Sequence, residues 1–102
     1  CRWELVDHHG GMGVTTPIDS PAMRAAAAAI KKATGKAPAL IKSGGSIPVA
    51  GMLKARLGID TIFMGFGLDD DRVHSPNEKF ELDCFRMGAR SHAALIGELT
   101  GK

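Results

Sequence analysis

The spacing of hydrophobic residues along the chain predicts three helices separated by short extended segments. Apolar side chains recur at helical spacing in residues 21–34, 47–57 and 80–99. Residues 59–66 are apolar almost throughout, which is typical of a strand buried on both faces of a parallel sheet. Further short extended runs are expected at residues 3–6, 13–16 and 38–41.

Capping residues set the expected ends of the first two helices. Ser20 is a favourable N-cap, Pro21 suits the first helical position, and Gly35 suits the left-handed residue that ends a helix. Ser46 is expected to cap the second helix and Gly58 to end it.

Each helix is expected to bury one apolar face. That of the first helix consists mainly of small side chains, so this helix should pack closely against a flat surface such as a sheet. The residues expected to face the core are Met23, Ala26, Ala27 and Ile30 in the first helix, Val49, Met52, Leu53 and Leu57 in the second, and Leu82, Phe85, Ala89, Ala93, Ile96 and Leu99 in the third.

The alternation of helices and strands indicates an α/β fold with a mostly parallel sheet. Two central strands, at residues 38–41 and 59–66, cannot form a stable sheet alone, so neighbouring strands must come from elsewhere. The chain begins at Cys1 with residues that already resemble a strand. We therefore expect it to be a piece of a longer protein.

Composition and charge narrow the class of protein. The 102 residues are 44% hydrophobic and 24% charged, which indicates one globular core. The net charge of +2 is too small to indicate a nucleic-acid partner. Two cysteines, Cys1 and Cys84, do not form a disulfide framework and favour a reduced, cytoplasmic protein. No apolar run is long enough for a membrane span, and no signal-peptide pattern is present.

Two polar loops carry the candidate chemistry. Residues 74–78, His-Ser-Pro-Asn-Glu, follow the apolar strand and three aspartates, and a neutral imidazole in such a loop is a good metal ligand. Residues 43–48, Ser-Gly-Gly-Ser-Ile-Pro, open a helix whose N–H groups favour an anion. This second loop lacks the lysine and the spacing of a phosphate-binding loop, so phosphate binding is the weaker hypothesis.

Other polar residues have simpler interpretations. His8 and His9 point to opposite faces if they lie on a strand, so we expect an exposed pair rather than a metal site. His92 is expected on the surface of the last helix or partly packed. The three aspartates at 69–71 are interpreted as a solvated loop with only an incidental effect on the local potential.

The residues from Gly44 to Val49, and those from Gly65 to Phe80, closely resemble the C-terminal part of a known family. This is the co-catalytic zinc amidohydrolase and peptidase family, which includes carnosinase-type dipeptidases, aminoacylase, acetylornithine deacetylase and succinyl-diaminopimelate desuccinylase. The resemblance covers most of the chain. It implies that residues 18–102 belong to a three-layer α/β/α catalytic domain and that residues 1–17 are the last strands of an inserted lid domain.

The same resemblance implies roles for particular residues. His74 would ligate one of two zinc ions, for which cobalt or manganese can substitute, and Gly45 and Ser46 would face the substrate's carboxylate. Asn77 and Glu78 would orient the loop around His74. The remaining metal ligands and the general base would lie outside this chain, so it would contain no catalytic residue of its own.

The resulting hypothesis is a fragment of a metal-dependent hydrolase that is inactive alone. Within a full-length homodimer it would help to cleave a dipeptide or an N-acyl amino acid with a zinc-activated water. No nucleic-acid or membrane partner is expected. The alternative is a non-catalytic assembly module derived from the same family.

Overall fold

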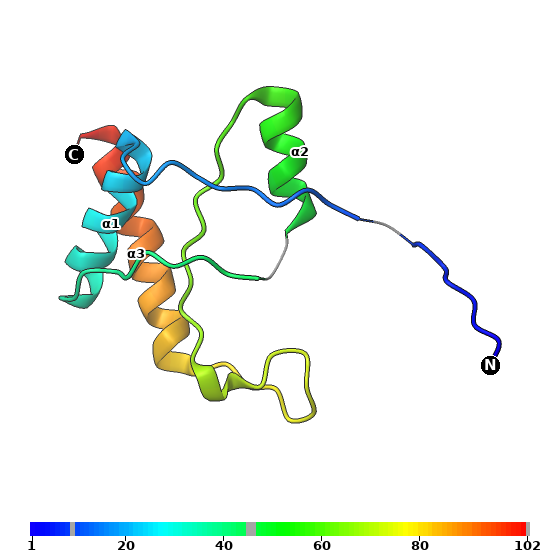
Figure 1. The fold of residues 1–102 in the computed structure, drawn as a ribbon. Coiled ribbons are helices and arrows are strands. Elements are labelled where there is room, and N and C mark those ends of the chain that lie inside the picture. Colours follow the sequence, from blue (N-terminus) through cyan, green and yellow to red (C-terminus); the bar gives the residue numbers. More distant parts are fainter. Residues whose placement is uncertain (9, 45–46, 102) are drawn as a thin grey trace. The chain divides into compact units, whose positions relative to one another are not determined.

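The computed structural model describes residues 1–8, 10–44 and 47–101. In this part of the chain the helices are α1 (Pro21–Thr34), α2 (Pro48–Leu57), the short 3-10 helix η1 (Asp69–Asp71) and α3 (Leu82–Thr100) (Figure 1). The chain divides into two compact units. The first comprises Cys1–Pro17 and Ile41–Thr61, and the second comprises Ile18–Leu40 and Ile62–Lys102.

The expected sheet is not confirmed, because none of the described residues forms a strand. The expected strands at residues 3–6, 13–16, 38–41 and 59–66 are therefore not formed. A strand exists only when its backbone N–H and C=O groups pair with those of a neighbour. The apolar pattern of residues 59–66 therefore marks a segment suited to a sheet without supplying the partner strands.

α1 begins and ends where the capping residues predict. The hydroxyl of Ser20 accepts a hydrogen bond of 3.2 Å from the backbone N–H of Met23, and Pro21 occupies the first turn. Gly35 adopts a left-handed conformation with φ of 75°, and its N–H donates to the carbonyl of Lys31 at 2.8 Å. Lacking a Cβ, glycine adopts this conformation without steric cost, so the helix ends there.

The two ends of α2 differ in how far the structure tests their predicted caps. The residue that precedes its first turn is Ile47, which makes no side-chain capping bond. Ser46, which was expected to cap this helix, lies outside the described residues. The end is as predicted, since Gly58 is left-handed and donates to the carbonyl of Lys54 at 3.0 Å.

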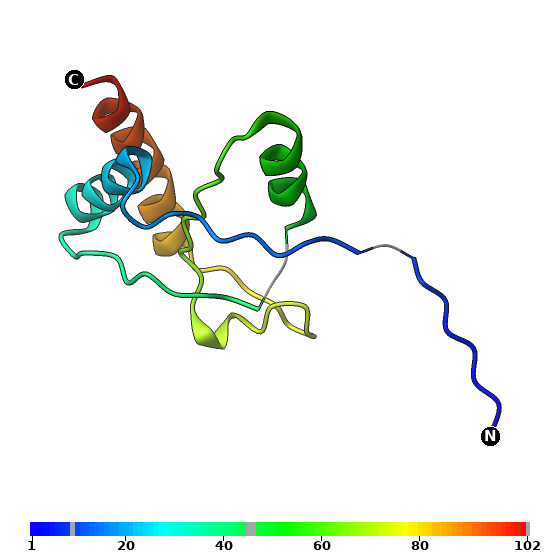
Figure 2. The same ribbon diagram turned by 45° about the horizontal axis from the view of Figure 1, so that its top comes forward.

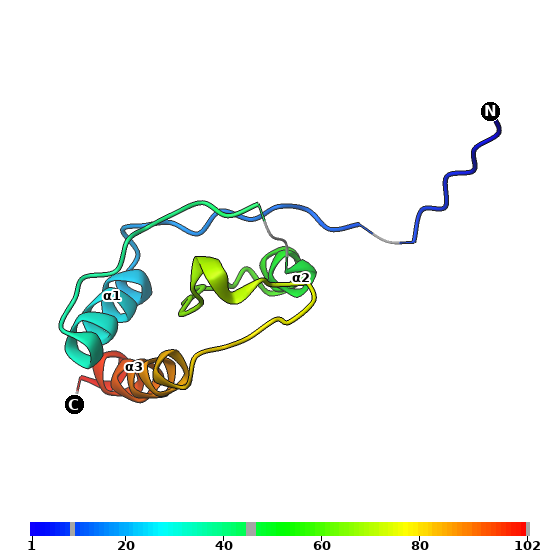
Figure 3. The same cartoon turned by 90° about the horizontal axis from the view of Figure 1, so that it is seen from below.

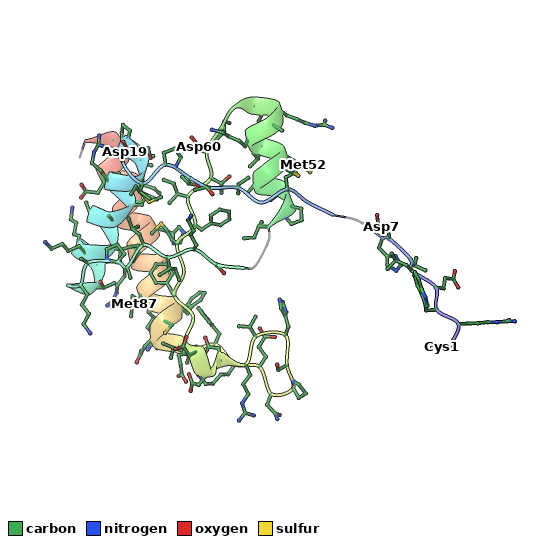
Figure 4. The ribbon with its side chains drawn as sticks, viewed as in Figure 1. Cys1, Asp7, Asp19, Met52, Asp60 and Met87 are labelled. Carbon is green, nitrogen blue, oxygen red and sulfur yellow. The ribbon has the colours of Figure 1, made fainter. Side chains whose placement is uncertain are left out.

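The predicted buried face of α2 is wrong for most of its members. Ala50 is the buried residue of this helix, whereas Val49, Met52 (labelled in Figure 4) and Leu57 are exposed and Leu53 is half-buried. The backbone next to Ala50 is approached closely: a Cβ added at Gly51 would lie 3.2 Å from the carbonyl oxygen of Met12. The side of α2 with small residues thus faces the chain segment at Met12, whereas the large side chains of Val49, Met52 and Leu57 are exposed to solvent.

The second unit is built on the packing of α1 against α3, which lie side by side (Figures 2 and 3). The contact uses small side chains: α1 buries Ala26 and Ala29, and α3 buries Cys84, Gly88 and Ser91. Because such residues project little from the helix, the two backbones can approach closely. The expectation that α1 packs closely through small side chains is confirmed, but its partner is the helix α3 and not a flat surface such as a sheet.

The face of α3 that was predicted to be buried is exposed instead. Leu82, Phe85, Ile96 and Leu99 are between 58% and 69% exposed, and Ala89 and Ala93 are exposed as well. The helix also begins at Leu82 rather than at Phe80. The ring of Phe66 covers the small-residue face, because a Cβ added at Gly88 would lie 3.2 Å from Cδ2 of that ring. The hydrophobic pattern correctly identified an apolar face of α3. The buried face is a different one, because its small residues allow α1 and the ring of Phe66 to approach the helix closely.

Among the described helices, none is long and apolar enough to cross a membrane.

Candidate functional site

The loop that carries His74 leaves η1 and returns to the start of α3 (Figure 1). We call residues 72–78 the His74 loop. It lies between two residues, Asp71 and Lys79, that bond to each other through both backbone and side chain. The N–H of Lys79 donates to the carbonyl of Asp71 at 3.0 Å, and Nζ of Lys79 donates to Oδ1 of Asp71 at 2.8 Å. We call this pair of contacts the Asp71–Lys79 clasp.

Asp71 is a buried carboxylate with a partner on each oxygen. It is 1% exposed, and while Oδ1 accepts from Lys79, Oδ2 accepts from the backbone N–H of Leu68 at 2.8 Å. A buried charge is tolerated when it is paired and hydrogen-bonded in this way, and it is strongly unfavourable when it is not. The carboxylate therefore links the residue before η1, η1 itself and the far end of the His74 loop.

Lys79 is surrounded by carboxylates. Besides Asp71, its ammonium group lies 3.2 Å from Oδ1 of Asp70 and 3.1 Å from Oε1 of Glu81. The hydrogen bond from Lys79, followed by that from the N–H of Leu68, holds the pKa of Asp71 below its usual range. The hydrogen bond to Asp71, with smaller contributions from Glu81 and Asp70, raises the pKa of Lys79. Both members of the clasp are therefore charged at neutral pH.

The His74 loop has an unusual backbone. Arg72, His74 and Asn77 have φ of 55°, 60° and 60°, in the left-handed region. A side chain in this region costs on the order of 1 kcal/mol or more, so such a conformation persists only where surrounding contacts hold it. Two contacts lie within the loop: Ser75 N–H donates to the carbonyl of Arg72 at 2.9 Å, and His74 N–H lies 3.3 Å from Oε2 of Glu78.

The predicted site residues differ in how far the structure places them. His74 is exposed, and Glu78 contacts the backbone of His74, as a residue that orients the loop would. Asn77 contributes one of the left-handed turns of the loop. Gly45 and Ser46 lie outside the described residues. The roles of all five residues in metal or substrate binding stay predictions.

The interpretation of the three aspartates as a solvated loop is wrong for one of them. Asp69 and Asp70 are exposed, but Asp71 is buried in the clasp. The sequence contained a signal for this, since Asp71 and Lys79 enclose a polar segment of seven residues rich in turn formers. Charge alone could not show which of three adjacent aspartates points inward.

The other histidines fit their simpler interpretations where they are described. His8 is exposed, and His9 lies outside the described residues. His92 is exposed on α3, where Nδ1 lies 2.8 Å from the carbonyl of Gly88 and its ring lies 6.1 Å from that of Phe66. In the part of the chain that the structure describes, no three His, Cys, Asp or Glu side chains cluster so as to hold a metal ion.

The first unit contains a separate hollow of about 210 Å³ beside α2. Lys54 and Asp60 (labelled in Figure 4) line it and form an ion pair of 2.6 Å. The hydroxyl of Thr16 donates to the carbonyl of Thr61 across the same hollow at 2.6 Å. The Thr16 bond fastens the segment after α2 to the segment before α1, and the ion pair leaves the charges of Lys54 and Asp60 paired.

Comparison with known proteins identifies the family. The model of peptidase family M20/M25/M40 matches residues 2–98, which is nearly the whole chain. The chain belongs to this peptidase family. The family resemblance noted in the two loops is thus confirmed, and the match extends over residues 2–98.

Curated relatives agree with this assignment. The chain is 33% identical over 96 residues to the Cys-Gly metallodipeptidase DUG1 of Saccharomyces cerevisiae, covering 94% of the chain and 20% of that protein. It is 32% identical over 82 residues to the human Beta-Ala-His dipeptidase, covering 80% of the chain and 16% of that protein. The chain therefore spans about a fifth or less of the length of these M20/M25/M40 relatives. No solved structure matches the chain.

Proposed function

We propose that this chain is part of a metal-dependent peptidase that hydrolyses a dipeptide, with an N-acyl amino acid as the alternative substrate class. The observation that carries the proposal is the match of residues 2–98 to the M20/M25/M40 peptidase family. Two relatives that match most of the chain are a Cys-Gly metallodipeptidase and a Beta-Ala-His dipeptidase, which supports a short peptide as the substrate.

His74 is our candidate for the metal ligand of this chain. Its side chain is exposed at a loop whose two ends are joined by the Asp71–Lys79 clasp, so the imidazole is accessible from outside the chain. A protein zinc site normally uses three or four ligands, and the described residues bring no such set together. His74 therefore fits a metal as one donor, with the others supplied by parts of the protein outside this chain.

The other site residues have supporting roles in this proposal. Glu78 holds the backbone of His74 through the 3.3 Å contact with its N–H, and Asn77 supplies a left-handed turn. Gly45 and Ser46 would bind the substrate's carboxylate near the start of α2. We further propose zinc as the metal, with two ions per subunit, and a cytoplasmic homodimer as the assembly. A bound metal would activate water and polarise the scissile carbonyl.

The experiment uses the full-length protein that contains this chain. Hydrolysis of Cys-Gly, β-Ala-His and an N-acyl amino acid is assayed with zinc, manganese or cobalt, and the metal content per subunit is measured for the wild type, His74→Ala and His92→Gln. His92→Gln is the matched control, because it alters an exposed histidine of the same unit. We expect peptide hydrolysis by the wild type and loss of bound metal in His74→Ala alone.

Two results would contradict the proposal. Absence of hydrolysis of all three substrates by a metal-loaded, folded protein would favour a non-catalytic assembly module. Full metal content in His74→Ala would show that the ligand is a different residue.

A further inference from the structure

The Asp71–Lys79 clasp closes the His74 loop at its base. The carbonyl of Asp71 accepts from the N–H of Lys79, and its carboxylate accepts from Nζ of the same lysine. A backbone bond and a side-chain bond therefore close the loop at the same place. The carboxylate also accepts from the N–H of Leu68, which joins this point to the segment before η1. The backbone bond between Lys79 and Asp71 is therefore supported by two further bonds, both of which depend on the buried side chain of Asp71.

The loop needs such a closure because its own contacts are few. Three of its seven residues have left-handed backbones, which are unfavourable unless held from outside. Its internal bonds are the Ser75–Arg72 turn and the 3.3 Å contact between His74 N–H and Glu78, and the latter is exposed. Exposed contacts compete with water and order a loop weakly.

Asp71 differs from its neighbour Asp70, although both contact Lys79. Asp70 is exposed, and its 3.2 Å ion pair with Lys79 is accessible to water and salt. Asp71 is buried and fully bonded, so removing its charge or that of Lys79 leaves polar groups without partners in the interior. Asp70 thus provides a control within the same cluster.

We infer that Asp71, acting with Lys79, is a positioning residue that holds the His74 loop in the conformation that presents His74. This inference rests on the proposed function for the ligand role of His74, but the ordering of the loop by the clasp does not depend on it. Asp71 contacts neither substrate nor metal in this assignment, and it acts through the backbone that carries the imidazole.

The test has two readouts on the full-length protein. Amide hydrogen exchange of the peptide covering residues 68–80 is measured on metal-free protein, and metal content is measured after dialysis against a chelator. The variants are Asp71→Asn, the matched control Asp70→Asn, and the pair Lys79→Met and Lys79→Arg. Arginine keeps the positive charge and can still donate to the buried carboxylate.

We expect Asp71→Asn and Lys79→Met to speed amide exchange in the loop by about tenfold or more and to lose metal during dialysis. Asp70→Asn should change the exchange by less than about twofold, and Lys79→Arg should restore most of the protection. Exchange in α1 and α3 serves as the internal reference and should stay as in the wild type. If Asp71→Asn does not fold, the comparison of Lys79→Met with Lys79→Arg gives the same information.

The inference is overturned if Asp71→Asn and Asp70→Asn exchange alike. It is also overturned if His74→Ala loses its metal while Asp71→Asn, with a loosened loop, retains metal as the wild type does. A different outcome identifies a failure of the proposed function instead. If His74→Ala retains its metal while Asp71→Asn still loosens the loop, the clasp orders the loop but His74 is not the ligand.

Discussion

The helix pair α1–α3 and the His74 loop lie in the same unit but are held together by opposite means. The helix pair is joined by small side chains, Ala26 and Ala29 against Cys84, Gly88 and Ser91, which allow close packing. The loop is closed by hydrogen bonds that converge on one buried residue, Asp71, through its carbonyl and its carboxylate. Packing is spread over many atoms, whereas a polar closure can be undone at one residue. Substitutions should therefore affect the framework and the site separately.

The largest effect is expected for His74→Ala on the activity of the full-length protein. If the imidazole is a metal ligand, its loss should reduce kcat/KM on the order of a thousandfold or more, as the loss of a major electrostatic contribution does. The melting temperature of the metal-free protein should remain near that of the wild type, because His74 is exposed and outside the helix pair. A parallel fall in activity and in the metal-free melting temperature would mean that the loop and the framework are not separable.

The second prediction concerns the framework. Ala29 is fully buried where α1 packs on α3, so Ala29→Leu should lower the free energy of unfolding by about 1–3 kcal/mol through overpacking. The free energies of unfolding of the wild type and of Ala29→Leu are compared by denaturant titration. Ala28→Leu is the matched control on the exposed side of the same helix, and it should change stability by less than about 0.5 kcal/mol. Equal effects of the two substitutions would show that α1 does not pack tightly here.

The third prediction is a pH dependence of the loop. The pKa of Asp71 is lowered in the folded state, so its contribution to stability is present above the ordinary pKa of an aspartate and is lost as the pH falls through the lowered value. The pKa of Lys79 is raised, so its contribution is present below the ordinary pKa of a lysine and is lost only at still higher pH. The clasp should therefore stay closed from about pH 5 to pH 9.

The amide of Leu68 reports the acid side of this range, because it donates to the carboxylate of Asp71. Its NMR chemical shift should titrate with a midpoint below about pH 4, and this titration should be absent in Asp71→Asn. A midpoint above about pH 4 would show that Asp71 is not stabilised as the carboxylate.

The smallest effect on stability is expected on the open face of α3. Phe85 is 63% exposed, so Phe85→Lys should change the free energy of unfolding by no more than about 0.5 kcal/mol. The 102-residue chain by itself should nevertheless self-associate through exposed apolar residues, and this substitution should reduce the association seen by analytical ultracentrifugation. Phe85→Leu, which keeps the apolar surface, is the control. A monodisperse monomer at all concentrations would contradict this prediction.

The sequence by itself determined the local features of this protein. Ser20, Gly35 and Gly58 predicted helix ends correctly, because capping depends on the geometry of one or two residues and their immediate neighbours. The polar loop at residues 74–78 was also placed correctly between an apolar segment and a helix. The sequence of this loop, together with that of the Gly-Gly-Ser loop, was sufficient to indicate the peptidase family.

Only the tertiary structure decided which surfaces are buried and which charges are paired. α3 carries a row of large apolar residues and a row of small ones, and the small row is buried because it lets α1 and Phe66 come close. Three adjacent aspartates are equivalent in sequence, and both Asp70 and Asp71 contact Lys79, yet only Asp71 also accepts from the N–H of Leu68 and is buried. Strand formation likewise needs partners that residues 59–66 do not find among the described residues. Contacts between distant residues are set by the whole arrangement of the chain, so a local pattern cannot determine them.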